Sequence, residues 1–142
     1  MCPAAWPGGA PPLRDLAALM ARVREAVARE TAGEPALRSL FAANTARAWD
    51  QCRALTRFDA AAAARRVDRP LLVVAGDVDG VVTPRDAGAL AACARGADFE
   101  RVPCAGHLLP VTHPAGLAAR LGRFLALSEA RGGGSAPPAP RR

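Results

Sequence analysis

The sequence contains no Lys, no Tyr and no Ile, and every one of its 19 basic residues is Arg. The codons for the three absent residues are AT-rich, so their absence indicates a GC-rich coding sequence. The Arg residues are scattered among Asp and Glu, and only Arg65-Arg66 and Arg141-Arg142 are adjacent. Proteins that bind nucleic acids cluster their basic residues. The net charge of +6 therefore does not predict a nucleic-acid partner.

Long apolar runs and paired cysteines are also missing. No stretch approaches the roughly 18 apolar residues that a membrane span needs. The segment Met1–Gly9 has neither the basic nor the apolar region of a secretory signal. We therefore expect a cytoplasmic protein with no membrane partner. The cysteines include no C-x-x-C pair, which predicts no metal site and favours free, mostly buried thiols at Cys2, Cys52, Cys93 and Cys104.

The first part of the chain predicts helices. Residues 1–12 are rich in Pro and Gly and should be irregular. An amphipathic helix follows, ended by Gly33-Glu34-Pro35, with its apolar face at Leu13, Leu16, Leu19, Met20, Val23 and Val27. A second helix is predicted from Pro35 to about Arg57, with an inner face of Leu37, Leu40, Phe41, Ala48, Cys52 and Leu55. A short Ala-rich helix is predicted at residues 59–66.

The second part alternates strands and helices. Leu71–Ala75 is a continuous apolar run, typical of a parallel strand that is covered on both faces. Thr83-Pro84 predicts the start of a helix that continues to about Arg95. A second strand is predicted at residues 98–102, parallel and adjacent to the first. His113-Pro114 opens the last helix, whose apolar stripe is Leu117, Leu121, Phe124 and Leu125, and the tail from Gly132 should be disordered.

Two groups of residues follow these strands directly. The first strand leads into Gly76, Asp79 and Pro84, and the second into Pro103, Gly106, His107 and later Pro114. This pattern resembles the C-terminal part of the α/β-hydrolase family over roughly residues 58–127, although Thr112 stands where that family often has Glu. The resemblance implies that Asp79 is the acid and His107 the base of a catalytic triad. It also implies an α/β fold: a partial α/β-hydrolase sheet made of its last two parallel strands, preceded by cap-like helices.

The chemistry of the two residues is consistent with this resemblance. Loops at the carboxyl edge of a parallel sheet carry the sites of α/β proteins. Asp79 on one loop can accept a hydrogen bond from Nδ1 of His107 on the next, which fixes the tautomer and stabilises the imidazolium. Gly106 should let the backbone turn tightly before the histidine. Asp77 is expected to cap the turn through bonds to its own backbone.

The nucleophile of such a triad is not recognisable. The family carries it in G-x-S-x-G, and this sequence has only Ser39, Ser128 and Ser135, none in that motif. Cys104 lies three residues before His107, and we interpret it as a bystander thiol rather than a nucleophile. Asp77-Val78-Asp79-Gly80 also resembles the first motif of haloacid-dehalogenase-type phosphatases, which bind Mg²⁺. That family needs a downstream Lys, and the chain has none.

The sequence thus predicts cap-like helices in residues 1–57, the C-terminal part of a hydrolase core in 58–130 and a disordered tail in 131–142, with no cofactor. Two functions remain open. The chain is part of a hydrolase of small esters, amides or lactones, inactive alone, or it is a non-catalytic remnant or binding module. A sheet of two strands leaves an edge open, so we expect a homodimer or a complementing chain at that edge. A small-molecule substrate is expected only for a completed site.

Overall fold

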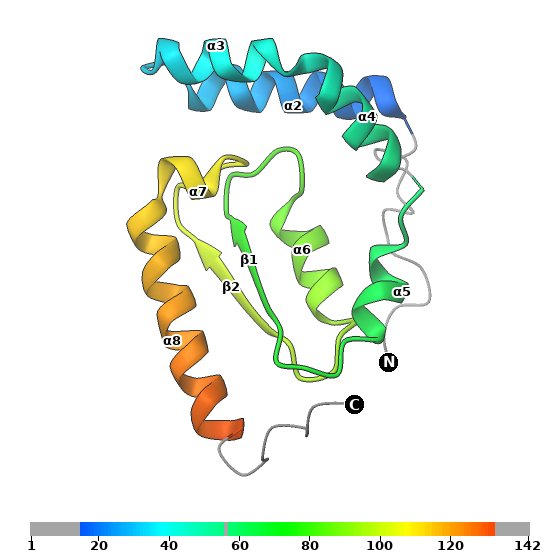
Figure 1. Cartoon of the computed structure of the whole chain (residues 1–142), viewed down its shortest axis with the longest axis vertical. Coiled ribbons are helices and arrows are strands. Elements are labelled where there is room, and N and C mark those ends of the chain that lie inside the picture. Colours follow the sequence, from blue (N-terminus) through cyan, green and yellow to red (C-terminus); the bar gives the residue numbers. More distant parts are fainter. Residues whose placement is uncertain (1–14, 56, 133–142) are drawn as a thin grey trace, which may run out of the picture.

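The computed structural model describes residues 15–55 and 57–132 (Figure 1). This part of the chain is a mixed α/β fold with seven helices and a parallel pair of strands. The predictions for residues 1–12, Leu13, Cys2, Ser135 and the tail 133–142 fall outside the described residues. The elements are α2 (Leu16–Glu30), α3 (Pro35–Ala43), α4 (Thr45–Leu55), α5 (Ala60–Arg65), β1 (Leu72–Gly76), α6 (Pro84–Ala91), β2 (Asp98–Val102), α7 (Leu109–Thr112) and α8 (Pro114–Gly132).

The two strands pair as the sequence predicted. β1 and β2 are parallel neighbours, in a register that runs from Leu72 opposite Asp98 to Gly76 opposite Val102. Successive strand residues point to opposite faces. A Cβ added to Gly88 of α6 would contact Phe99, whereas Glu100 bonds to Arg123 of α8. Helices α6 and α8 therefore cover opposite faces of the sheet.

Helix α6 begins as predicted and ends earlier. The Thr83 side chain accepts a hydrogen bond from the Asp86 N–H at 3.2 Å and donates one to the Asp86 carboxylate at 2.7 Å. Pro84 takes the first helical position, where its missing N–H is not needed. The helix ends at Ala91 rather than near Arg95. The connection to β2 turns through Gly96 at φ +69°, a conformation that glycine adopts without strain.

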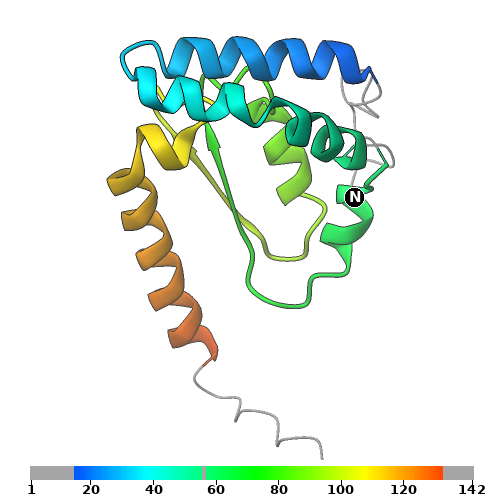
Figure 2. The ribbon, with the colours of Figure 1, turned by 45° about the horizontal axis from the view of Figure 1, so that its top comes forward.

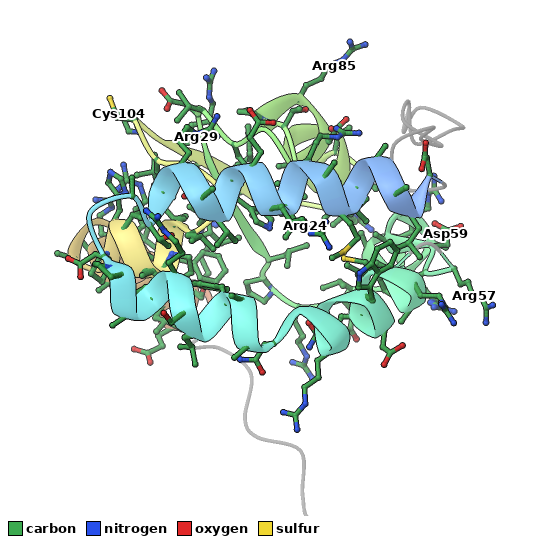
Figure 3. All side chains as sticks on the ribbon, turned by 90° about the horizontal axis from the view of Figure 1, so that it is seen from above. Arg24, Arg29, Arg57, Asp59, Arg85 and Cys104 are labelled. Carbon is green, nitrogen blue, oxygen red and sulfur yellow. The ribbon has the colours of Figure 1, made fainter. Side chains whose placement is uncertain are left out.

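Helices α2, α3 and α4 form a helical layer across the carboxyl ends of both strands (Figures 1 and 2). Seen from above, α2 lies beside α3 and α4 (Figure 3). Asp15 caps α2 by accepting the Ala18 N–H at 3.0 Å. The layer has its own apolar core, which also takes in Val81 from the loop after β1; its other buried members are Leu19, Met20, Ala26 and Cys52.

The single helix predicted from Pro35 to Arg57 is wrong, because α3 and α4 are separate helices. Asn44 interrupts them, with φ −100° and ψ 13°. Its side chain donates to the carbonyl oxygen of Leu40 at 2.8 Å, and its backbone N–H bonds to Phe41 instead. Asparagine competes with the helix in this way because its side chain can bond to nearby backbone groups.

Several side chains predicted to face inward are exposed. Leu40 and Leu55 in the helical layer are 59% and 52% exposed, and Leu121 and Leu125 of α8 are 43% and 59% exposed. The amphipathic pattern identifies apolar side chains on these helices, but within residues 15–55 and 57–132 these four are not buried. Cys52 is buried as predicted, and the Ala48 side chain is outside those that the structure describes.

The long helix α8 is linked to β2 by ion pairs as well as by apolar packing. Glu100 lies 3.1 Å from Nε of Arg120 and 3.2 Å from a terminal nitrogen of Arg123, and Asp98 lies 3.8 Å from Arg131. The helix extends to Gly132, so the predicted disordered tail does not begin at residue 131. None of the helices in the described ranges has the length and apolarity to cross a membrane.

Candidate active site

Asp79 lies in the loop that follows β1, and both of its carboxylate oxygens have donors. Oδ1 accepts hydrogen bonds from the backbone N–H groups of Val81 at 2.7 Å and Val82 at 3.0 Å. An aspartate that bonds to backbone two and three residues ahead stabilises a tight turn. The turn fixes the carboxylate, which leaves Oδ2 pointing toward the loop after β2.

His107 lies in that neighbouring loop, at the same edge of the sheet. Its Nδ1 is 3.1 Å from Oδ2 of Asp79. The two side chains are 30% and 10% exposed, so the contact is largely shielded from water. Because an ionised carboxylate only accepts hydrogen bonds, Nδ1 carries the proton of this contact. The structure thus brings together Asp79 and His107, the two residues proposed from the sequence, which lie 28 positions apart in the chain.

Each partner favours the charged form of the other. Burial alone would raise the pKa of Asp79, but hydrogen bonds from His107, Val81 and Val82 outweigh it and lower that pKa. The hydrogen bond to Asp79 raises the pKa of His107, burial opposes the rise, and the negative charges of Asp79 and Glu30 add to it. The arrangement therefore stabilises an imidazolium beside a carboxylate.

The two loops are bound to each other by backbone contacts. The N–H of Asp77 donates to the carbonyl of Val102 at 3.1 Å, and the N–H of Val78 donates to the carbonyl of Ala105 at 3.0 Å. Gly76 at the end of β1 makes this approach possible. A Cβ at Gly76 would collide with the backbone of Ala105 and Gly106. Only glycine leaves room for the second loop against the strand end.

A hollow of about 300 Å³ adjoins the pair. Its wall contains Asp79 and His107 and is otherwise apolar, with further lining from Val74, Ala75, Gly76, Val82, Ala87, Gly106, Leu109, Pro110 and Leu117. None of these lining residues carries a hydroxyl or thiol. The hollow is about the size of a small ligand site, yet its own walls offer no nucleophile.

Glu30, the last residue of α2, is a member of this site that sequence reasoning missed. Its carboxylate accepts hydrogen bonds from the backbone N–H groups of His107 at 2.8 Å and Leu108 at 2.7 Å. Glu30 lies 77 and 78 residues before these partners, and no local sequence pattern distinguishes it from the other acidic residue of the helix. Gly106 was the available signal, because a Cβ there would collide with the Glu30 carboxylate. Glycine at position 106 therefore leaves room for the Glu30 carboxylate.

The expected role of Asp77 is wrong. Asp79 makes the bonds that stabilise the turn, whereas Oδ1 of Asp77 is buried and has no hydrogen-bond partner among the described residues. The reason is spacing, since the free N–H groups of the turn lie two and three residues after Asp79. With both oxygens of Asp79 held by His107 and the backbone, the geometry does not favour the alternative phosphatase interpretation, in which this carboxylate holds Mg²⁺.

The candidate nucleophiles lie elsewhere. Ser39 is on α3 and Ser128 on α8, and neither lines the hollow. Cys104 is exposed, at φ +60°, and its side chain points outward in Figure 3. His113, at the junction of α7 and α8, contacts the Thr112 hydroxyl at 2.8 Å. The structure thus brings an acid and a histidine together without a nucleophile among the described residues of this site.

Comparison with known proteins gives one partial likeness. The chain is 35% identical over 113 residues to the polyketide synthase ThaQ of Burkholderia thailandensis, a match that covers 78% of this chain and 5% of that protein. The chain therefore spans about a twentieth of the length of this relative. No described protein family matches the chain, and no solved structure matches it.

Proposed function

We propose that this chain supplies the acid and the base of an α/β-hydrolase active site whose nucleophile comes from another segment. The contact of 3.1 Å between Nδ1 of His107 and Oδ2 of Asp79 carries the proposal. It joins two loops at the carboxyl edge of a parallel sheet, the place where α/β proteins bind their ligands. The spacing of Gly76, Asp79, Gly106 and His107 in the sequence supports the same family.

The chemistry follows from the hydrogen bonds. With Nδ1 committed to Asp79, Nε2 of His107 is the nitrogen that can take a proton from a hydroxyl or thiol nucleophile. The carboxylate of Asp79, which is largely shielded from water, stabilises the imidazolium that results. His107 then returns the proton to the leaving group. Both residues are positioned by backbone bonds, so the pair needs little rearrangement to act.

The open edge of β1 is the place where a segment carrying the nucleophile could join the sheet. Among the described residues, no strand pairs with the other edge of β1. The exposed apolar side chains of α8, Leu121 and Leu125, offer surface that a further layer would cover. Unpaired strand edges and apolar faces normally gain a partner. We infer that a complementing segment completes the sheet there and brings the nucleophile, whereas a second copy of the chain would complete the sheet alone.

The substrate class is a small ester, amide or lactone, cleaved by acyl transfer. The hollow beside the pair is apolar apart from Asp79 and His107, which suits an acyl group. The likeness to a stretch of a polyketide synthase adds polyketide acyl esters to the substrates that a test should include.

The chain by itself is expected to be inactive. Purified protein should not hydrolyse p-nitrophenyl esters above background, and a fluorophosphonate probe should not label it, because the hollow has no hydroxyl in its walls. Labelling that one Ser→Ala change abolishes would contradict this, with Ser39→Ala and Ser128→Ala as the variants to compare. Labelling by iodoacetamide together with activity that Cys104→Ala removes would instead assign the nucleophile to the exposed cysteine.

The decisive experiment supplies the nucleophile. The DNA directly upstream of the Met1 codon is searched for an in-frame G-x-S-x-G, and that segment is produced together with this chain. Ester hydrolysis that falls at least about a thousandfold in both Asp79→Asn and His107→Ala supports the proposal. Hydrolysis that neither substitution changes would overturn it. Tight ligand binding in the hollow without any hydrolysis would favour the alternative, a non-catalytic binding module.

A further inference from the structure

The helical layer contacts the candidate site at two points. Val81, two residues after Asp79, is buried in the apolar core that the layer forms around Leu19 and Met20. Glu30, at the carboxyl end of α2, bonds to the loop that carries His107. One helix of the layer thus restrains the loops of both the acid and the histidine.

The Glu30 contact has the features of a specific interaction. Its two oxygens accept one N–H each, from His107 at 2.8 Å and from Leu108 at 2.7 Å. Hydrogen bonds to an ionised carboxylate are shorter and stronger than neutral ones. Leu108 is buried and Glu30 is half-buried, so water competes poorly for these donors. Because Gly106 has no side chain, the carboxylate can lie directly against the loop.

The carboxylate also acts on the imidazole electrostatically. The charged groups that face His107 are Asp79 from the β1 loop and Glu30 from α2. Helices α7 and α8 contribute Leu109, Pro110 and Leu117 to the hollow around the ring. Both carboxylates favour the imidazolium, so the removal of either lowers the pKa of His107.

We propose that Glu30 is a positioning residue for His107, which holds the backbone of the histidine loop and couples the docking of α2 to the acid–base pair. That this role matters for catalysis rests on the proposed function. The contact between Glu30 and the backbone of His107 is independent of it. A segment that lifts α2 away from the strand ends therefore releases the histidine loop at the same time. The helical layer is part of the site rather than a cover over it.

The test compares Glu30→Gln with Glu25→Gln, which removes the same charge from an exposed position of the same helix. Hydrogen exchange at the His107 and Leu108 amides should be about tenfold faster in Glu30→Gln than in the control. The pKa of His107, followed by NMR of its imidazole, should fall in Glu30→Gln. None of these readouts depends on a nucleophile, so their failure is distinct from the failure of the proposed function.

A second comparison tests the same contact through folding stability, and exchange of the His107 and Leu108 amides in the wild-type protein tests it without any substitution. Gly106→Ala should lower the melting temperature of the wild-type chain, because its methyl group meets the Glu30 carboxylate. The same change in a Glu30→Ala background should lower it much less. Equal losses in both backgrounds would overturn the proposal. So would rapid exchange of the His107 and Leu108 amides in the wild-type protein, or an unchanged His107 pKa in Glu30→Gln.

Discussion

The Gly76→Ala variant is expected to lose about 3 kcal/mol of unfolding free energy. The added methyl group meets the backbone of Ala105 and Gly106, and backbone cannot rotate away as a side chain can. Two hydrogen bonds fix the loop in that position, from Asp77 to Val102 and from Val78 to Ala105. Relief therefore requires separation of the two loops. Urea unfolding followed by circular dichroism measures the loss.

Gly122→Ala is the matched control for this experiment. Gly122 lies inside α8, and a Cβ there meets nothing within 4 Å. Alanine in a helix interior is more favourable than glycine by about 0.5–1 kcal/mol, so this variant should be slightly more stable than the wild type. The same Gly→Ala substitution should therefore lower the unfolding free energy at position 76 and raise it at position 122. A Gly76→Ala protein as stable as Gly122→Ala would show that the loop after β2 does not press against the end of β1.

The Asp79→Ala variant is expected to lose about 2–4 kcal/mol of stability. It removes the acceptor for His107 and for the N–H groups of Val81 and Val82, all within 3.1 Å. Asp79→Asn keeps an amide oxygen for the two N–H groups, so it should cost less, but it removes the charge that stabilises the imidazolium. The pKa of His107 should therefore fall in both variants, as measured by NMR.

The dependence of stability on pH follows from the same pair. The lowered pKa of Asp79 contributes stability above its ordinary value of about 4, and that contribution is lost as pH falls through the folded pKa. The raised pKa of His107 contributes below its ordinary value of about 6.5, and that contribution is lost as pH rises through the folded pKa. The difference in stability between wild type and Asp79→Asn should be largest between these two values.

Asp77→Asn is the control, because Asp77 lies in the same loop and its Oδ1 has no hydrogen-bond partner among the described residues. This substitution should leave the pH profile of stability and the pKa of His107 unchanged. A wild-type profile that does not differ from that of Asp79→Asn between pH 4 and 8 would contradict the contact between Asp79 and His107.

The parts of the site that the sequence could predict are those that local rules determine. The apolar run of β1 and the Thr83-Pro84 start of α6 are local signals, and they fix where the loop of Asp79 begins. Parallel strands with one crossover helix end at the same edge, which brings the loop of His107 beside it. These two facts predict neighbouring loops, and the resemblance to the α/β-hydrolase pattern selected Asp79 and His107 within them.

The rest depended on contacts that a local pattern does not encode. The periodicity of α8 marks Leu121 and Leu125 as apolar, but it does not tell whether another element covers them. Asn44 ends α3 through a side-chain bond that competes with the helix, which an apolar pattern does not register. Glu30 meets its partners across 77 residues, so its role emerges only once the helical layer has docked.

Because α8 is attached by apolar contacts near its start and by ion pairs in its later turns, ionic strength should affect the two ends of this helix differently. Its first turns pack Leu117 against Val102 and Leu109, an apolar contact that added salt does not weaken. Its later turns depend on Arg120, Arg123 and Arg131, which meet the acids of β2. Charges near the surface are screened over roughly 3 Å at 1 M salt. Concentrated salt should therefore weaken the contacts of the later turns of α8 more than those near its start, where Leu117 lines the hollow.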